Sequence, residues 1–215
     1  GQSLISNDGR YVLFAATHDP VGQNPDNVVQ FFLCDRGPAL NRDCRNVTSG
    51  ALEQITTGHG AWAATMSPEG RFIAFQQTGN PLNDNGDNSN EIFLCDRKAG
   101  QGSCQPEDGG LIQLTSWFPP VTFDPAVLTG NSDMTVGQML LKNLSDLPVE
   151  AQAMSLSDDG RFIAFKSYHD LTGTGANVLD GIFRAANNTT PITQWFVCDR
   201  GGDLNVKELM MMADI

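Results

Sequence analysis

Asn7-Asp8-Gly9-Arg10-Tyr11-Val12-Leu13-Phe14 introduces a pattern that this chain repeats twice more. The further copies are Pro68-Glu69-Gly70-Arg71-Phe72-Ile73-Ala74-Phe75 and Asp158-Asp159-Gly160-Arg161-Phe162-Ile163-Ala164-Phe165. A second phrase follows each copy: Phe32-Leu33-Cys34-Asp35-Arg36, Phe93-Leu94-Cys95-Asp96-Arg97 and Phe196-Val197-Cys198-Asp199-Arg200. Two phrases that recur in the same order indicate an array of equivalent supersecondary units.

Each unit divides into four expected strands, which in the second unit are 65–67, 71–77, 91–96 and 111–115. The Asp-Gly or Glu-Gly pair between the first two strands supplies the positive φ that tight hairpins need. The following apolar run does not alternate with polar residues, which indicates a strand covered on both faces. A four-stranded antiparallel sheet covered on both faces by its own copies is a propeller blade. We therefore expect an all-β fold, a β-propeller with three blades in this chain.

The second unit also resembles a known family. Ser67-Pro68-Glu69-Gly70, the strand after it, Glu91-Ile92-Phe93 and Ile112-Gln113-Leu114-Thr115 are similar to the repeat of TolB-like β-propellers. In that family a Ser-Pro-Asp-Gly turn, an aliphatic-aromatic strand, an Asp-(Val/Ile)-(Phe/Tyr) strand and a Leu-Thr ending recur. The resemblance implies a propeller fold and says little about function, because such propellers serve unrelated functions.

The spacing of the turns sets the expected boundaries. Blades are predicted at about 1–58, 59–116 and 152–215, with an insertion at about 117–151 that lengthens the interval before the third copy. A second insertion precedes Cys198. The third strand of the last unit has two candidate positions, 180–184 and 195–200, and the Cys-Asp-Arg match favours the later one.

Three blades are fewer than the four to eight with which propellers close. Three completions are open. Two copies of the chain could pair, further blades could lie in sequence outside this chain, or the open edges could pair with other chains, since unpaired strand edges favour association.

The chain is strongly acidic, with 25 Asp and Glu against 13 Lys and Arg and a net charge of −12. This charge repels nucleic acid and anionic lipid. No apolar run reaches the length of about eighteen residues that a membrane-spanning helix needs. We therefore expect neither a nucleic-acid partner nor membrane insertion.

The cysteines follow the repeat, because Cys34 is followed by Cys44 and Cys95 by Cys104. Each pair spans an expected hairpin and can reach the separation that a disulfide requires. Such bridges contribute about 3 kcal/mol each and imply an oxidising, extracytoplasmic location: periplasmic, cell-surface or secreted. Zinc is the alternative, but neither loop contains Cys-x-x-Cys or a histidine. The repeat predicts no bridge for Cys198, which leaves a thiol or a bond outside this chain.

The loop between the second and third strands of the second unit is rich in oxygen ligands. Calcium is the candidate cofactor there, because the alternating side chains resemble the ligands of a calcium loop. These side chains are Asn83, Asn85, Asp87, Ser89 and Glu91. The alternative is a solvated turn without metal, since Asn and Asp are common turn residues.

Charged residues recur at the same two places in every unit: Asp35, Asp96 and Asp199 after the cysteine, and Arg10, Arg71 and Arg161 after the turn glycine. A catalytic residue would more naturally occur once. We therefore predict an architectural role in which Asp accepts turn hydrogen bonds and Arg pairs with a nearby carboxylate.

The leading hypothesis is a non-enzymatic, exported β-propeller module that acts as a protein-binding or assembly scaffold. Its candidate binding residues are Trp117, Phe118 and Trp195, and the insertion is the expected partner surface. One alternative is a structural subunit of an extracellular assembly, joined through open blade edges and Cys198. Another is the propeller portion of a longer hydrolase or peptidase, in which case this chain alone has no activity.

Overall fold

The residues that the structure describes form three antiparallel sheets of four strands each. The computed structural model describes residues 2–45, 50–58, 60–85, 90–100, 102–115, 154–167, 194–200 and 208–211. The first sheet contains β1 (Ser3–Ile5), β2 (Tyr11–Ala16), β3 (Gln30–Asp35) and β4 (Leu52–Gln54). The second contains β5 (Ala61–Met66), β6 (Phe72–Gln77), β7 (Glu91–Asp96) and β8 (Leu111–Gln113). The third contains β9 (Ser155–Leu156), β10 (Phe162–Ser167), β11 (Gln194–Asp199) and β12 (Glu208–Met211).

Strands adjacent in sequence are adjacent in each sheet, so every sheet is a simple meander. The all-β class and the four-stranded antiparallel units predicted from sequence are confirmed. β11 occupies the later of the two candidate positions, because Ile163 in β10 pairs with Cys198. The first strand of the second sheet differs from the prediction of 65–67. β5 begins at Ala61, with a register shift between Ala61 and Ala63.

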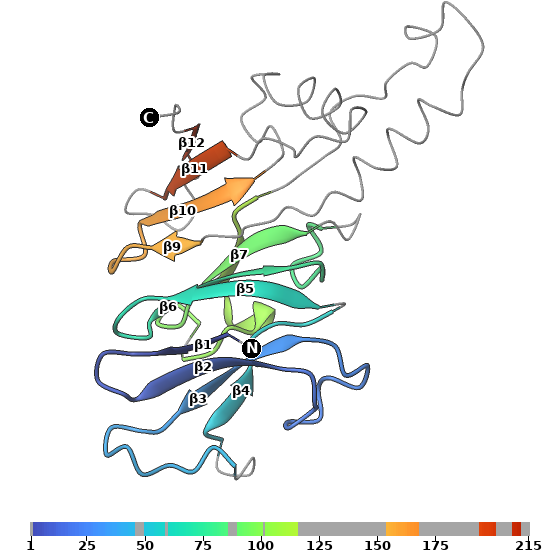
Figure 1. The fold of residues 1–215 in the computed structure, drawn as a ribbon, viewed down its shortest axis with the longest axis vertical. Coiled ribbons are helices and arrows are strands. Elements are labelled where there is room, and N and C mark those ends of the chain that lie inside the picture. Colours follow the sequence, from blue (N-terminus) through green and yellow to red (C-terminus); the bar gives the residue numbers. More distant parts are fainter. Residues whose placement is uncertain are drawn as a thin grey trace, which may run out of the picture.

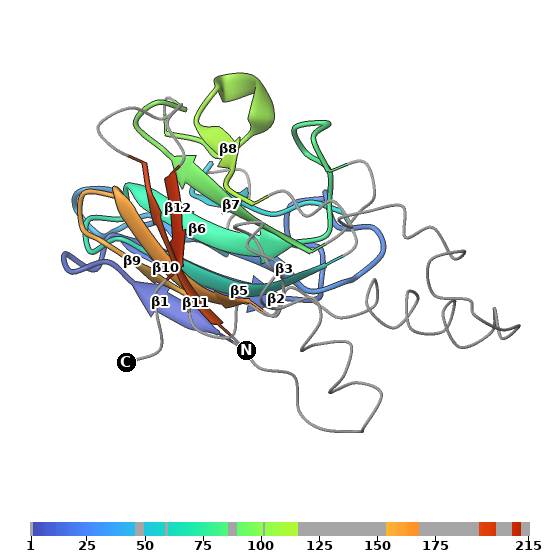
Figure 2. The same ribbon diagram turned by 90° about the horizontal axis from the view of Figure 1, so that it is seen from above.

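The three sheets stack face to face in chain order (Figures 1 and 2). One buried cluster joins the first sheet to the second, and a separate cluster joins the second to the third. Ile73 and Phe75 of β6 belong to the first cluster, whereas Phe72 and Ala74 belong to the second. Successive side chains of a strand point to opposite faces. The unbroken apolar run of β6 therefore reflects burial on both sides.

The hairpin before each second strand has the same construction. The turn glycines Gly9, Gly70 and Gly160 have φ of 71°, 70° and 70°. In the first turn the Ser6 hydroxyl accepts a hydrogen bond from the Tyr11 amide at 2.9 Å. Ser67 does the same for Phe72, and Ser157 for Phe162. Ser67 thus belongs to the turn rather than to the strand, which corrects the end of the predicted first strand.

Both predicted disulfides are present. The Cα atoms are 5.7 Å apart in Cys34–Cys44 and 5.4 Å apart in Cys95–Cys104. Each bond ties the end of a third strand to the loop that follows it. Cys198 is 1% exposed and packs in the cluster between the second and third sheets. This burial argues against the idea that Cys198 links chains.

The insertion predicted at about 117–151 lies outside the described residues, as do Trp117 and Phe118. Within the described part of the chain, no helix has the length and apolarity needed to cross a bilayer.

Candidate functional site

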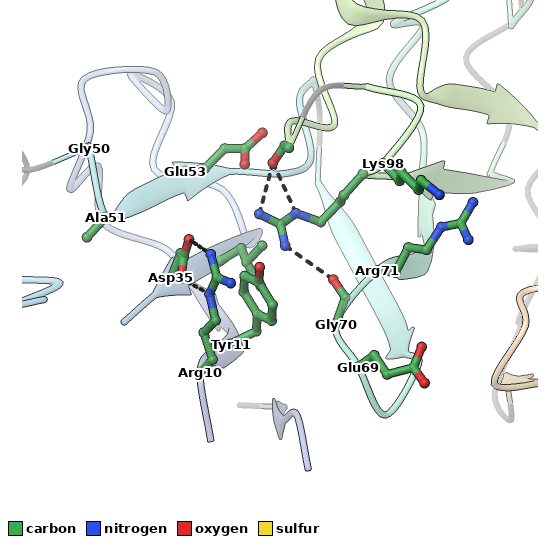
Figure 3. A pocket seen from close by; sticks show the side chains of 13 residues that line it. Arg10, Tyr11, Asp35, Gly50, Ala51, Glu53, Glu69, Gly70, Arg71 and Lys98 are labelled. Atoms are coloured by element: carbon green, nitrogen blue, oxygen red, sulfur yellow. Dashed lines mark hydrogen bonds and ion pairs between the residues drawn. The ribbon is translucent and has the colours of Figure 1, made fainter. Parts of the chain in front are cut away.

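A cavity of about 540 Å³ lies between the first two sheets (Figure 3). It is lined by charged and aromatic residues of both sheets together with loop backbone. The lining residues are Arg10, Tyr11, Leu33, Asp35, Gly50, Ala51, Glu53, Glu69, Gly70, Arg71, Arg97, Lys98 and Gly102. What the cavity can bind depends on whether these charges are already engaged within the protein.

On the side of the first sheet, Arg10 is engaged with Asp35. Its Nε and Nη2 donate to the two carboxylate oxygens of Asp35 at 2.7 and 2.9 Å, as Figure 3 shows. These bonds hold the pKa of Asp35 below its usual value against the opposing effect of burial, and the amide of Gly37 acts in the same direction. The Arg10 guanidinium also lies over the ring of Tyr11, 4.7 Å from its centroid.

From the second sheet, Arg97 reaches across the cavity. It donates to the carbonyl oxygens of Gly70 and Gly102 at 3.2 and 2.9 Å. Its guanidinium also lies 4.4 Å from the centroid of Tyr11 in the first sheet. Tyr11 is therefore held between an arginine of its own sheet and one of the next.

Glu53 of the first sheet also bonds across the boundary. Its carboxylate accepts hydrogen bonds from the Ser103 hydroxyl and the Cys104 amide, each at 2.9 Å. The residues of the cavity thus join the two sheets. We interpret the cavity as part of the structural interface between the two sheets. Glu69 and Lys98 line it from the second sheet (Figure 3).

The arginine–carboxylate pair recurs in all three sheets. Arg71 binds Asp96 at 2.8 and 2.7 Å, and Arg161 binds Asp199 with two bonds of 2.7 Å. Burial alone would raise the pKa of Asp96. The bonds and charge of Arg71, together with the amides of Lys98 and Ala99, outweigh that effect and lower it. The recurring Asp and Arg thus have the architectural role that their repetition predicted.

The arginine of each Cys-Asp-Arg phrase has a second recurring contact. Arg36, Arg97 and Arg200 donate to the carbonyl oxygens of the turn glycines Gly9, Gly70 and Gly160. The repeat indicates that these arginines are equivalent, but the sequence carries no signal of the acceptor. This contact ties the third strand to the first hairpin in every sheet.

Two of the predicted calcium ligands have protein partners. The Asn85 side-chain amide donates hydrogen bonds to the carbonyl oxygens of Thr78 and Gly79. In the first sheet, the Asn24 side-chain amide donates in a similar way to the carbonyl oxygens of Thr17 and Val28.

Glu91 is the second of these residues, and its buried carboxylate accepts a hydrogen bond from the Thr115 hydroxyl. At the equivalent place in the first sheet, the Gln30 side chain accepts a hydrogen bond from the Thr56 hydroxyl. Asn83 has a left-handed φ of 59°, whereas Asp87 and Ser89 lie outside the described residues. The described ranges contain no group of three His, Cys, Asp or Glu placed to hold a metal. Calcium binding stays a prediction.

The remaining binding candidate, Trp195, is at the surface of the third sheet. It is 38% exposed, and the Lys166 amine lies 4.8 Å from its ring centroid. Phe162 is also 38% exposed, and Ile5 of the first sheet is 66% exposed. The sequence did not indicate that Phe162 and Ile5 are exposed, because the repeat also has apolar residues at the equivalent positions of the second sheet, where they pack in or against the buried clusters.

These exposed side chains have buried counterparts in the second sheet. Phe72, equivalent to Phe162, is 2% exposed, and Ile92, equivalent to Trp195, is fully buried. The outer face of the third sheet thus has the apolar character of an inter-sheet surface. It is the most distinctive candidate binding surface among the described residues.

Comparison with protein-family models gives no match, and comparison with curated proteins gives none either. Among solved structures, the chain is similar to part of the tricorn protease in its crystal structure. The TM-score is 0.40 and the identity 13%, over 93% of this chain. This chain spans 14% of the length of that protease chain. A similarity at this level supports no inference about activity, so the description of the fold rests on the three sheets themselves.

Proposed function

We propose that this chain is an exported module of the β-propeller type that acts as a protein-binding or assembly scaffold without catalysis of its own. The observation that carries the proposal is the contrast between equivalent positions. Phe162 and Trp195 are exposed on the third sheet, while Phe72 and Ile92 are buried in the second. A surface built for packing on another sheet and left exposed is suited to binding a partner.

Two further features support the proposal. The stacking of equivalent four-stranded sheets is the arrangement of propeller blades, which agrees with the TolB-like phrases of the repeat. The disulfides Cys34–Cys44 and Cys95–Cys104 support export, since such bonds persist in oxidising compartments. The blades would then comprise residues 1–58, 59–116 and 152–215.

A capture experiment tests the proposal. The full chain and a Phe162→Asp variant, which alters the exposed face of the third sheet, would each be immobilised without reductant and exposed to an extracytoplasmic extract of the source cells. A variant lacking 118–150 tests the insertion as a second surface. We expect the full chain to retain a defined protein partner and Phe162→Asp to lose it with an unchanged β-type circular dichroism spectrum. Undiminished capture by Phe162→Asp would contradict the role of this face, and loss of the spectrum on deletion would contradict the role of the insertion. A full chain that neither captures a protein nor self-associates would contradict the scaffold function.

A further inference from the structure

The two sheet boundaries inside the chain use the same set of contacts. At the first, the ring of Tyr11 lies against Gly70, where a Cβ atom would overlap with it. At the second, the ring of Phe72 lies against Gly160 in the same way. Each boundary is thus formed by an aromatic ring of one sheet and the turn glycine of the next.

An arginine of the following sheet covers each of these rings. The guanidinium of Arg97 is 4.4 Å from the centroid of Tyr11, and that of Arg200 is 5.3 Å from the centroid of Phe72. Both arginines are buried, at 8% and 6% exposure. A cation over an aromatic face is a favourable contact, and it strengthens when water is excluded.

The first strand of the following sheet adds an aliphatic side chain to each boundary. Met66 packs on the first cluster and Leu156 on the second. Met66 pairs with Ile73, and Leu156 pairs with Ile163. The residue at the same register position in the first sheet is Ile5, which pairs with Val12.

The outer faces of the third and first sheets each carry one side of such a boundary. The outer face of the third sheet has the aromatic side chains, with Phe162 and Trp195 each 38% exposed. The outer face of the first sheet has the turn glycine, the arginine and the aliphatic side chain. No described atom lies within 4 Å of the Cβ position of Gly9, Arg36 is half-buried, and Ile5 is 66% exposed.

We infer that the outer face of the third sheet binds the outer face of the first sheet in a second copy of this chain, head to tail. Phe162 lies against Gly9 of the other copy, Arg36 of that copy covers its ring, and Ile5 packs beside it. The contact repeats an interface that the chain already forms twice within itself. Two such contacts between two copies close a ring, as heterologous interfaces can. The inference rests on the proposed scaffold function and names its partner.

Single charges at the two faces test the inference. Ile5→Asp alters only the first sheet's face and Phe162→Asp only the third sheet's face, and both side chains are exposed enough for the fold to tolerate the change. Trp62→Asp is the matched control, because Trp62 is 57% exposed on the middle sheet. Native mass spectrometry without reductant reports the assembly, and circular dichroism confirms the fold of each variant.

We expect dimers for the wild type and for Trp62→Asp. Each end-face variant should dissociate, with a dissociation constant raised about 100-fold or more, because a buried unpaired carboxylate is costly. An equimolar mixture of Ile5→Asp and Phe162→Asp should recover a mixed dimer, since one unaltered first-sheet face meets one unaltered third-sheet face.

A wild-type chain that is monomeric at about 100 µM, well above the dissociation constants of specific complexes, would overturn the inference. End-face variants that still form dimers would overturn it too, as would a mixture that stays monomeric. If the wild type is monomeric but the insertion captures a partner, the head-to-tail contact is wrong and the scaffold function stands.

Discussion

At the scale of single residues, the bidentate pairs between arginine and aspartate stabilise each sheet at the same place. Their surroundings differ, because the Asp96 side chain is 4% exposed and that of Asp35 is 18% exposed. The exposed pair Arg45–Asp43 has the same geometry without burial, at 92% and 50% exposure. These differences predict unequal effects of the same substitution.

Asp96→Asn should lower the free energy of unfolding by about 2 kcal/mol, since it weakens two charge-assisted hydrogen bonds at a buried site. Asp43→Asn should produce no measurable change, because exposed ion pairs contribute little. Urea denaturation followed by circular dichroism checks both. Equal losses for the two variants would show that burial of the carboxylate does not set the effect.

The lowered pKa values of Asp35 and Asp96 predict the dependence of stability on pH. In the unfolded chain these groups take up a proton near pH 4, while in the folded chain they remain ionised to lower pH. The unfolded state then binds more protons, so this stabilisation is present above about pH 4 and is lost as the pH falls through the folded-state pKa. The slope of unfolding free energy against pH between about 2 and 4 should be smaller in Asp96→Asn than in the wild type. An identical slope would contradict the assignment.

At the scale of elements, the sequence predicts the strands that a repeated motif delimits. It does not predict strand ends or hydrogen bonds that depend on contacts with neighbouring strands. β7 begins and ends at the predicted residues, Glu91 and Asp96, because a turn, an apolar run and the Cys-Asp-Arg phrase delimit it. The start of β5 was missed, since Ala61-Trp62-Ala63-Ala64 has weak strand propensity and includes a register shift. The bond from Thr115 to Glu91 could not be predicted, because it depends on side-chain placement across two strands.

The turn glycines predict how closely two elements meet. Gly70→Ala and Gly9→Ala place alanine at nearly the same φ, about 70°, so each should lose about 1 kcal/mol from backbone strain. Gly70→Ala should lose about 1–3 kcal/mol more, because its Cβ would overlap with the Tyr11 ring of the neighbouring sheet. Thermal unfolding of the two variants at low protein concentration measures the difference. Equal losses would mean that the sheets do not meet at this glycine.

The disulfides predict a second difference between elements. Removal of Cys95–Cys104 by serine substitution should lower the unfolding free energy by about 3 kcal/mol from loop entropy. The loss should exceed that for Cys34–Cys44, because Cys104 is 1% exposed within the cluster between the first two sheets, while Cys44 is only half-buried. Denaturant titrations of the two double variants, without reductant, compare them. A larger loss for Cys34–Cys44 would contradict this order.

At the scale of the whole molecule, the described residues form three equivalent sheets that pack through two equivalent boundaries, and the outer faces of the first and third sheets each carry one side of such a boundary. The repeat phrases predicted the sheets and their order, and the burial on both faces that they predicted holds for the second sheet. They did not predict the exposure of Ile5 and Phe162. Residues at these equivalent repeat positions are all apolar, and their exposure depends on which sheet packs against them. The candidate binding surface follows from that difference and therefore required the structure.

Hydroxyl-radical footprinting of the wild-type chain over a range of concentrations tests this arrangement most directly. Phe72 and Phe162 are chemically identical and occupy the same position in neighbouring sheets, but they are 2% and 38% exposed. We expect Phe72 to resist oxidation at every concentration, and Phe162 to be oxidised in dilute protein and protected as copies associate. Oxidation of Phe72 as fast as that of Phe162 would contradict the stacking of the sheets.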